Sequence, residues 1–137
     1  MKFVRILRPL LSLFVLSAIL LSVVACGKEE PMEKFNRLEA DLKERGFNVI
    51  RYGEGAENAT LQLNVAEGVI CFMEATRGSE YLRVKMFENE EEAAMVAKAW
   101  KESYEPAPNL FAEQDGNTIY YGSRSVYNLI KESYDLP

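Results

Sequence analysis

An apolar run of sixteen residues, 10–25, limits the part of this chain that can form a folded domain. Serines are its only polar residues, and three basic residues but no acidic ones precede it. A basic segment followed by such a run is typical of a secretory signal, and the run is slightly short for a membrane-spanning helix. We therefore expect residues 1–25 to be a signal peptide and the domain to form from later residues.

Residues 23–26 read Val-Val-Ala-Cys and stand directly at the end of the apolar run. With an aliphatic residue three places before the cysteine and a small residue just before it, they resemble the lipobox of bacterial lipoproteins. The resemblance implies that the Cys26 sulfur receives a diacylglyceryl group and that a signal peptidase cuts between Ala25 and Cys26. A free secreted protein and a single uncleaved anchor are the alternatives.

The lipoprotein resemblance also implies a location. Two acyl chains on one cysteine hold a protein at a bilayer far more firmly than one chain does. We therefore expect a protein anchored to the cell membrane on its extracytoplasmic side, with the membrane as its partner through the lipid on Cys26. Residues 26–31 would form a short tether and residues 32–137 a single domain. In a general way, that domain resembles small lipoproteins of bacterial envelopes, and this adds no site.

The residues that follow the leader are acidic. From residue 26 onward, 13 basic residues stand against all 21 acidic ones, which gives a net charge of −8. A domain that binds nucleic acid should carry a basic face, so we expect no nucleic acid among the partners. The remaining length leaves room for one domain, and we expect a monomer.

The chain offers few groups for catalysis or metal binding. It contains no histidine, and only Cys71 keeps a thiol if Cys26 is lipidated. A nucleophilic cysteine usually needs a neighbouring base, and zinc sites use His and Cys, so we expect no enzyme, no cofactor and no metal. Cys71 lies in an apolar strand-like run, where we expect a buried core residue. A glycosidase with paired carboxylates is the one chemistry that residue types leave open.

Hydrophobic periodicity predicts the fold class. Apolar residues recur at helical spacing in 32–45, 90–104 and 123–134, and they alternate or cluster as in strands between these segments. We expect an α+β fold in which an antiparallel sheet carries helices on one face, in the order helix, four strands, helix, hairpin, helix. The expected strands are 47–52, 60–65, 69–75 and 81–87, followed by a hairpin of 110–114 and 117–121 around Asp115-Gly116.

The hairpin also supplies a candidate partner surface, because it has apolar residues on both faces. Tyr120 and Tyr121 are neighbours in a strand and must face opposite sides. Tyr121 alternates with Ile119, which favours Tyr121 as core, so we expect Tyr120 to be exposed beside Phe111. The alternative is that these aromatic residues have no special role.

Together these patterns predict a non-catalytic binding or accessory protein of the bacterial cell envelope. Its partner would be an unknown envelope protein or a glycan, which Phe111 and Tyr120 would contact. A structural or protective envelope component without a specific ligand is the alternative.

Overall fold

The computed structural model describes residues 29–104 and 107–137. Pro31–Pro137 form one compact unit. The expectations for residues 1–25, for cleavage between Ala25 and Cys26, and for the lipid on Cys26 lie outside the described residues.

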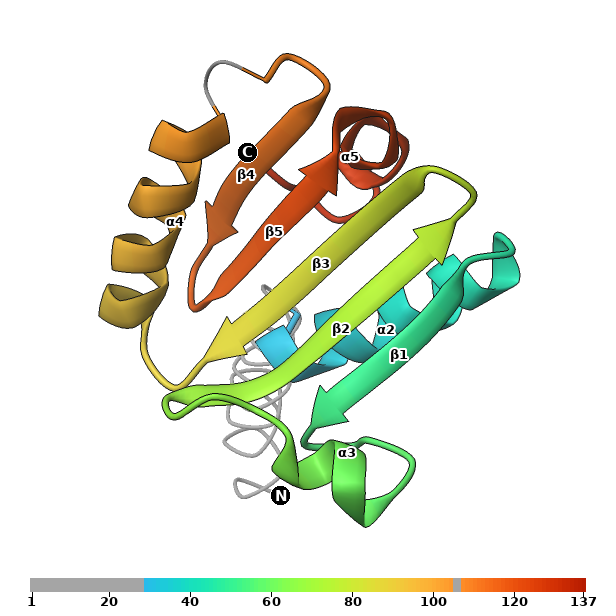
Figure 1. Ribbon diagram of the computed structural model, residues 1–137, viewed down its shortest axis with the longest axis vertical. Coiled ribbons are helices and arrows are strands. Elements are labelled where there is room, and N and C mark those ends of the chain that lie inside the picture. Colours follow the sequence, from blue (N-terminus) through green and yellow to red (C-terminus); the bar gives the residue numbers. More distant parts are fainter. Residues whose placement is uncertain (1–28, 105–106) are drawn as a thin grey trace, which may run out of the picture. The chain divides into compact units, whose positions relative to one another are not determined.

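The unit is built on a five-stranded antiparallel sheet with the strand order β1-β2-β3-β5-β4 (Figure 1). The expected α+β class with an antiparallel sheet is confirmed. Consecutive strands pair except where β5 lies between β3 and β4, which places β1 and β4 at the two edges. The strands are β1 (Asn48–Gly53), β2 (Val69–Arg77), β3 (Glu80–Phe87), β4 (Leu110–Asp115) and β5 (Thr118–Ser123).

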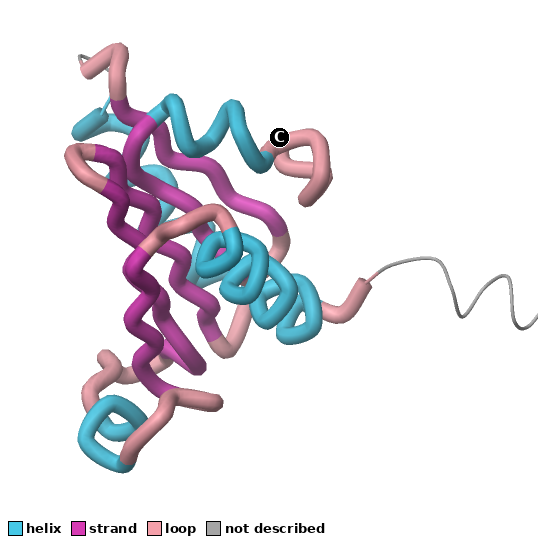
Figure 2. The backbone as a smooth tube through the Cα atoms, turned by 90° about the vertical axis from the view of Figure 1, so that its right-hand side faces the viewer, coloured by secondary structure: helices cyan, strands magenta, loops and turns pink. Residues whose placement is uncertain are grey.

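Two helices, α2 (Pro31–Glu44) and α5 (Arg124–Ile130), cover one face of the sheet (Figure 2). In α2, Phe35, Leu38 and Leu42 recur three and four positions apart, so they form one apolar stripe that is fully buried. The main core lies between these helices and the strands. The strand residues in it are Cys71, Met73, Ala75, Leu82, Val84, Met86, Phe111 and Tyr120.

The helix α4 (Glu90–Tyr104) lies on the opposite face, so the expectation that all helices share one face is wrong for α4. Its buried residues Ala93 and Ala97 pack with Phe87 and Ile119 in a second, smaller core. The reason is that β5 has apolar side chains on both of its faces, and each face needs a cover. The Asn89 side chain caps the start of this helix, because its Oδ1 accepts a hydrogen bond from the Glu92 N–H at 2.9 Å.

Residues 60–65 do not form the expected strand, and the sheet has five strands rather than six. The segment instead contains a short helix, α3 (Ala59–Leu63). Asn58 caps it, because its Oδ1 accepts a hydrogen bond from the Leu61 N–H at 3.0 Å. The apolar residues that alternate here are not buried as in a strand, since Leu63 is 84% exposed.

The hairpin of β4 and β5 is confirmed. Asp115 pairs with Thr118, so Gly116 and Asn117 form a two-residue loop. Gly116 has φ +58°, a conformation that favours glycine at the first position of such a loop. The hairpin thus joins the edge strand to β5, which contributes residues to both cores.

Candidate functional site

Phe111 and Tyr120, the candidate partner surface, are buried, and the expectation that they are exposed is wrong. Their exposed fractions are 3% and 2%. Tyr120 pairs with Val84 on β3 and shares its inward face, and the Phe111 ring lies 4.5 Å from the Tyr127 ring of α5. Tyr121, on the other face, is also buried. The sequence pattern that could have shown this is the run of three consecutive apolar residues, 119–121, in β5, because consecutive apolar residues on a strand face both sides of the sheet.

A different surface of the sheet is left uncovered. Figure 1 shows α4 towards the β4 edge, and among the described residues no helix lies in front of β1, β2 and β3. We call this surface the open face. It consists of Ile50 and Tyr52 on β1, Phe72 and Glu74 on β2, and Tyr81, Arg83 and Lys85 on β3.

The open face forms because side chains alternate along each strand. On β1, for example, Val49 and Arg51 point to the main core, whereas Ile50 and Tyr52 point away from it. All residues of the open face are half-buried except Ile50, which is 38% exposed.

The register of the strands brings the open face together as two rows. In one row Tyr52 is opposite Phe72, and Phe72 is opposite Lys85. In the other row Ile50 is opposite Glu74, and Glu74 is opposite Arg83. The Tyr52 and Phe72 rings stack with their centroids 5.6 Å apart. The rows therefore present an aromatic strip beside charged groups.

Cations lie between aromatic rings on this face. Arg83 donates from Nε to Oε2 of Glu74 at 2.9 Å, and its guanidinium carbon lies 5.1 Å from the centre of the Tyr81 ring. Lys85 Nζ lies 5.3 Å from the centre of the Phe72 ring. Burial, together with the positive charge of Arg83, lowers the pKa of Lys85 below its usual value. Aromatic residues and arginine are enriched in protein interfaces, so the composition of this surface is typical of a binding face.

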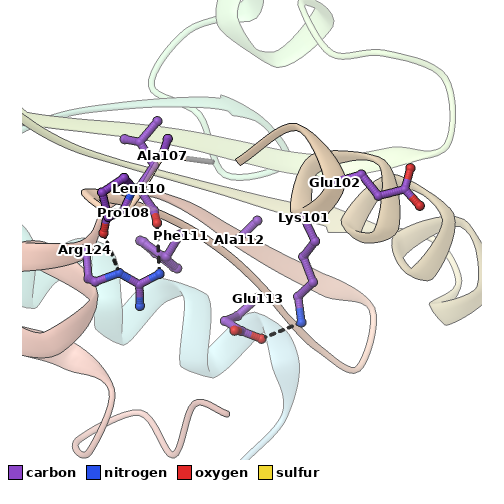
Figure 3. A pocket seen from close by; sticks show the side chains of 9 residues that line it. All are labelled: Lys101, Glu102, Ala107, Pro108, Leu110, Phe111, Ala112, Glu113 and Arg124. Carbon is purple, nitrogen blue, oxygen red and sulfur yellow. Dashed lines mark hydrogen bonds and ion pairs between the residues drawn. The ribbon is translucent and has the colours of Figure 1, made fainter. Parts of the chain in front are cut away.

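A cavity of about 480 Å³ lies between the end of α4, the start of β4 and α5 (Figure 3). Three of its four charged residues, Lys101, Glu113 and Arg124, are engaged with other parts of the protein. Lys101 on α4 forms an ion pair with Glu113 on β4 at 2.9 Å. Arg124 donates from Nε and Nη2 to the carbonyl oxygens of Pro108 and Leu110, each at 3.0 Å. These contacts tie α4 and α5 to β4, and we assign no ligand to this cavity.

Cys71 is a buried core residue, as expected, with no exposed surface. Burial raises the pKa of its thiol to about 12, so the thiol stays protonated at neutral pH. Within residues 29–104 and 107–137, no three His, Cys, Asp or Glu side chains are grouped so that they could hold a metal ion. No helix in the described part of the chain is both long enough and apolar enough to span a bilayer.

No protein-family model, curated protein or solved structure matches the chain. Comparison with known proteins therefore assigns no residue role, ligand or partner to this chain. The functional inference rests on the leader in the sequence and on the open face in the structure.

Proposed function

We propose that this chain is a lipid-anchored protein of the bacterial cell envelope that binds a partner protein through its open face. The anchoring part of the proposal rests on the sequence, where the basic and apolar leader ends in the lipobox-like residues 23–26. The binding part rests on one structural observation. Half of one sheet face carries aromatic and cationic side chains but no covering helix.

The uncovered state of this face is the main argument for binding. Helices cover the whole opposite face, and α4 covers the β4–β5 half of the same face. Removing apolar surface from water is favourable, so a strip made of exposed Ile50 and half-buried Tyr52 and Phe72 is more easily explained by a partner than by chance.

The anchor and the open face are compatible with each other. The chain enters the domain at Pro31, the first residue of α2, and α2 packs on the face of the sheet opposite to the open face. Four residues, 27–30, separate Cys26 from Pro31 in the sequence. A lipid on Cys26 would thus hold the domain within a few residues of the bilayer. The net charge of −8 also opposes close contact between the domain and anionic lipid.

Site-specific photocrosslinking tests the proposal. A benzophenone amino acid replaces Ile50 on the open face in the full-length protein, in the cells that produce it. Leu129 on α5 is the matched control, because it is an aliphatic residue with 39% exposure, against 38% for Ile50, on the other side of the sheet. We expect one discrete crosslinked protein from position 50 and none from position 129. Equal, diffuse crosslinking from both positions would instead support a structural component without a specific partner.

A further inference from the structure

Lys85 is placed where an anion could bind. Its ammonium group lies on the open face between two rings, with Nζ 5.3 Å from the centre of Phe72 and 5.4 Å from the centre of Trp100. The side chain is half-buried, so it cannot move freely into solvent. A cation between two ring faces is held by their quadrupoles, but the ammonium hydrogens still need oxygen acceptors.

The other cation on the open face already has a carboxylate partner. On the same strand as Lys85, Arg83 pairs with Glu74 at 2.9 Å. Among the described residues, Lys85 forms no ion pair with a carboxylate. Burial and the positive charge of Arg83 both lower the pKa of Lys85, so the surroundings of Lys85 lack a negative charge that would balance its ammonium group.

We propose that Lys85 binds the carboxylate of an acidic residue in the partner polypeptide, while apolar side chains beside that residue contact Phe72 and Trp100. This inference rests on the proposed function, and it specifies the chemistry of the partner segment. A carboxylate would accept charge-assisted hydrogen bonds from the ammonium group and restore the charge that burial disfavours.

The surroundings favour a single carboxylate with apolar neighbours over a polyanion. Glu74 neutralises Arg83, so the open face has one uncompensated positive charge. From residue 26 onward the chain carries a net charge of −8, which would repel an anionic polymer or an anionic lipid surface along its length. The aromatic rings around Lys85 match apolar side chains better than they match further charges. A peptide segment with one acidic residue among apolar residues fits the single uncompensated charge, the net negative charge of the chain and the aromatic rings.

The test uses the full-length protein in detergent and short random peptides displayed on phage. Peptides are retained if they protect Lys85, but not Lys98, from an amine-reactive label. Lys98 is an exposed lysine on α4, which makes it a control for general labelling. In each retained peptide the acidic residues are then replaced by their amides, one at a time. Binding is measured against the unchanged protein and against Lys85→Gln, Lys85→Arg and Lys98→Gln.

We expect one of the acid-to-amide replacements in the peptide to weaken binding about tenfold, and Lys85→Gln in the protein to do the same. Because the two changes remove the same interaction, combining them should weaken binding no further. Lys98→Gln makes the same change in net charge and should leave binding unchanged. Lys85→Arg keeps the positive charge and should preserve the preference for the acidic peptide. Circular dichroism of the Lys85 variants verifies that they remain folded.

Three results would overturn the proposal. Peptides that protect Lys85 and bind equally well as amides would show that the face binds without a carboxylate, and the proposed function would survive. Failure to select any peptide that protects Lys85, with no crosslink from position 50, would reject both. Binding to phosphatidylglycerol vesicles that depends on Lys85 would identify a lipid surface instead.

Discussion

Arg51 and Glu39 form an ion pair between the sheet and the helix that packs on it, with Arg51 Nη1 2.8 Å from Glu39 Oε2. The Arg51 side chain is only 7% exposed. Nη1 also donates to Asn36 Oδ1 at 2.6 Å, Nε donates to the Glu54 carbonyl oxygen at 2.7 Å, and Nη2 contacts the Met32 sulfur at 3.3 Å. Each nitrogen of the guanidinium at the edge of the main core therefore has a partner. This pair joins β1, which carries part of the open face, to α2.

We expect Glu39→Ala to destabilise the protein by about 3 kcal/mol, because it leaves a buried cation without its counter-ion. Glu44→Ala is the control, since it removes an exposed acid from the same helix and should cost less than about 0.5 kcal/mol. Urea unfolding of the two variants measures the difference. Similar losses for both would show that the ion pair contributes little.

The buried aromatic residues of the hairpin give a prediction opposite to the one that their sequence suggests. As surface residues, Phe111→Ser and Tyr120→Ser would each change stability by less than about 1 kcal/mol. Because both side chains are buried, we expect each substitution to cost about 3 kcal/mol or more. Leu129→Ser, at a position that is 39% exposed, is the control and should be nearly neutral. Thermal unfolding that ranks Leu129→Ser as the worst of the three would contradict the assigned core.

The Tyr134 hydroxyl donates a hydrogen bond to Asp41 Oδ2 at 3.1 Å, and burial together with this carboxylate raises its pKa to about 12. A tyrosine whose pKa is higher in the folded state than in the unfolded chain stabilises the fold below pH 10. That contribution is lost as the pH rises from 10 to 12. Cys71, with its pKa raised to about 12 from 9.0, adds a similar loss that begins near pH 9.

We therefore expect stability to fall between pH 9 and 12, and Tyr134→Phe to reduce the slope above pH 10. Chemical unfolding at several pH values measures both slopes. At neutral pH the variant should lose about 1 kcal/mol, since it lacks the hydrogen bond to Asp41. An unchanged slope above pH 10 would contradict the assigned environment of Tyr134.

Counting thiols tests the two cysteines together. Cys71 has no exposed surface and a raised pKa, so it should not react with a thiol reagent in the folded protein. If Cys26 is a lipidated thioether, denatured protein from membranes should show one reactive thiol per chain, and Cys71→Ala should show none. A second thiol after denaturation would contradict the lipid anchor.

Local signals in the sequence predict much of the fold. The helix at residues 90–104 has its expected bounds, because Asn89 caps its start and its apolar stripe is regular. The hairpin is predicted for the same kind of reason, since a glycine marks its two-residue loop. These features depend on neighbours in the chain, and a sequence pattern records such neighbours directly.

Most of the features that sequence reasoning misses depend on distant contacts. Residues 60–65 are an exception, because they alternate as a strand does, yet the local cap by Asn58 starts a helix there. The burial of Tyr120 follows from β5 lying between β3 and β4, with helices on both faces. The open face also depends on distant contacts. Which part of the sheet α4 covers is set by tertiary packing, and no local sequence pattern predicts it.

The central claim is that a partner covers the open face when the protein is at its membrane. Amine labelling of the wild-type protein tests this directly, by comparing Lys85 and Lys98 in native membranes with the same lysines in purified protein in lipid nanodiscs. We predict that Lys85 is labelled much less in native membranes than in nanodiscs, whereas Lys98 is labelled equally in both. Equal labelling of Lys85 in the two preparations would contradict the claim, because it would show that the open face has no partner where the protein works.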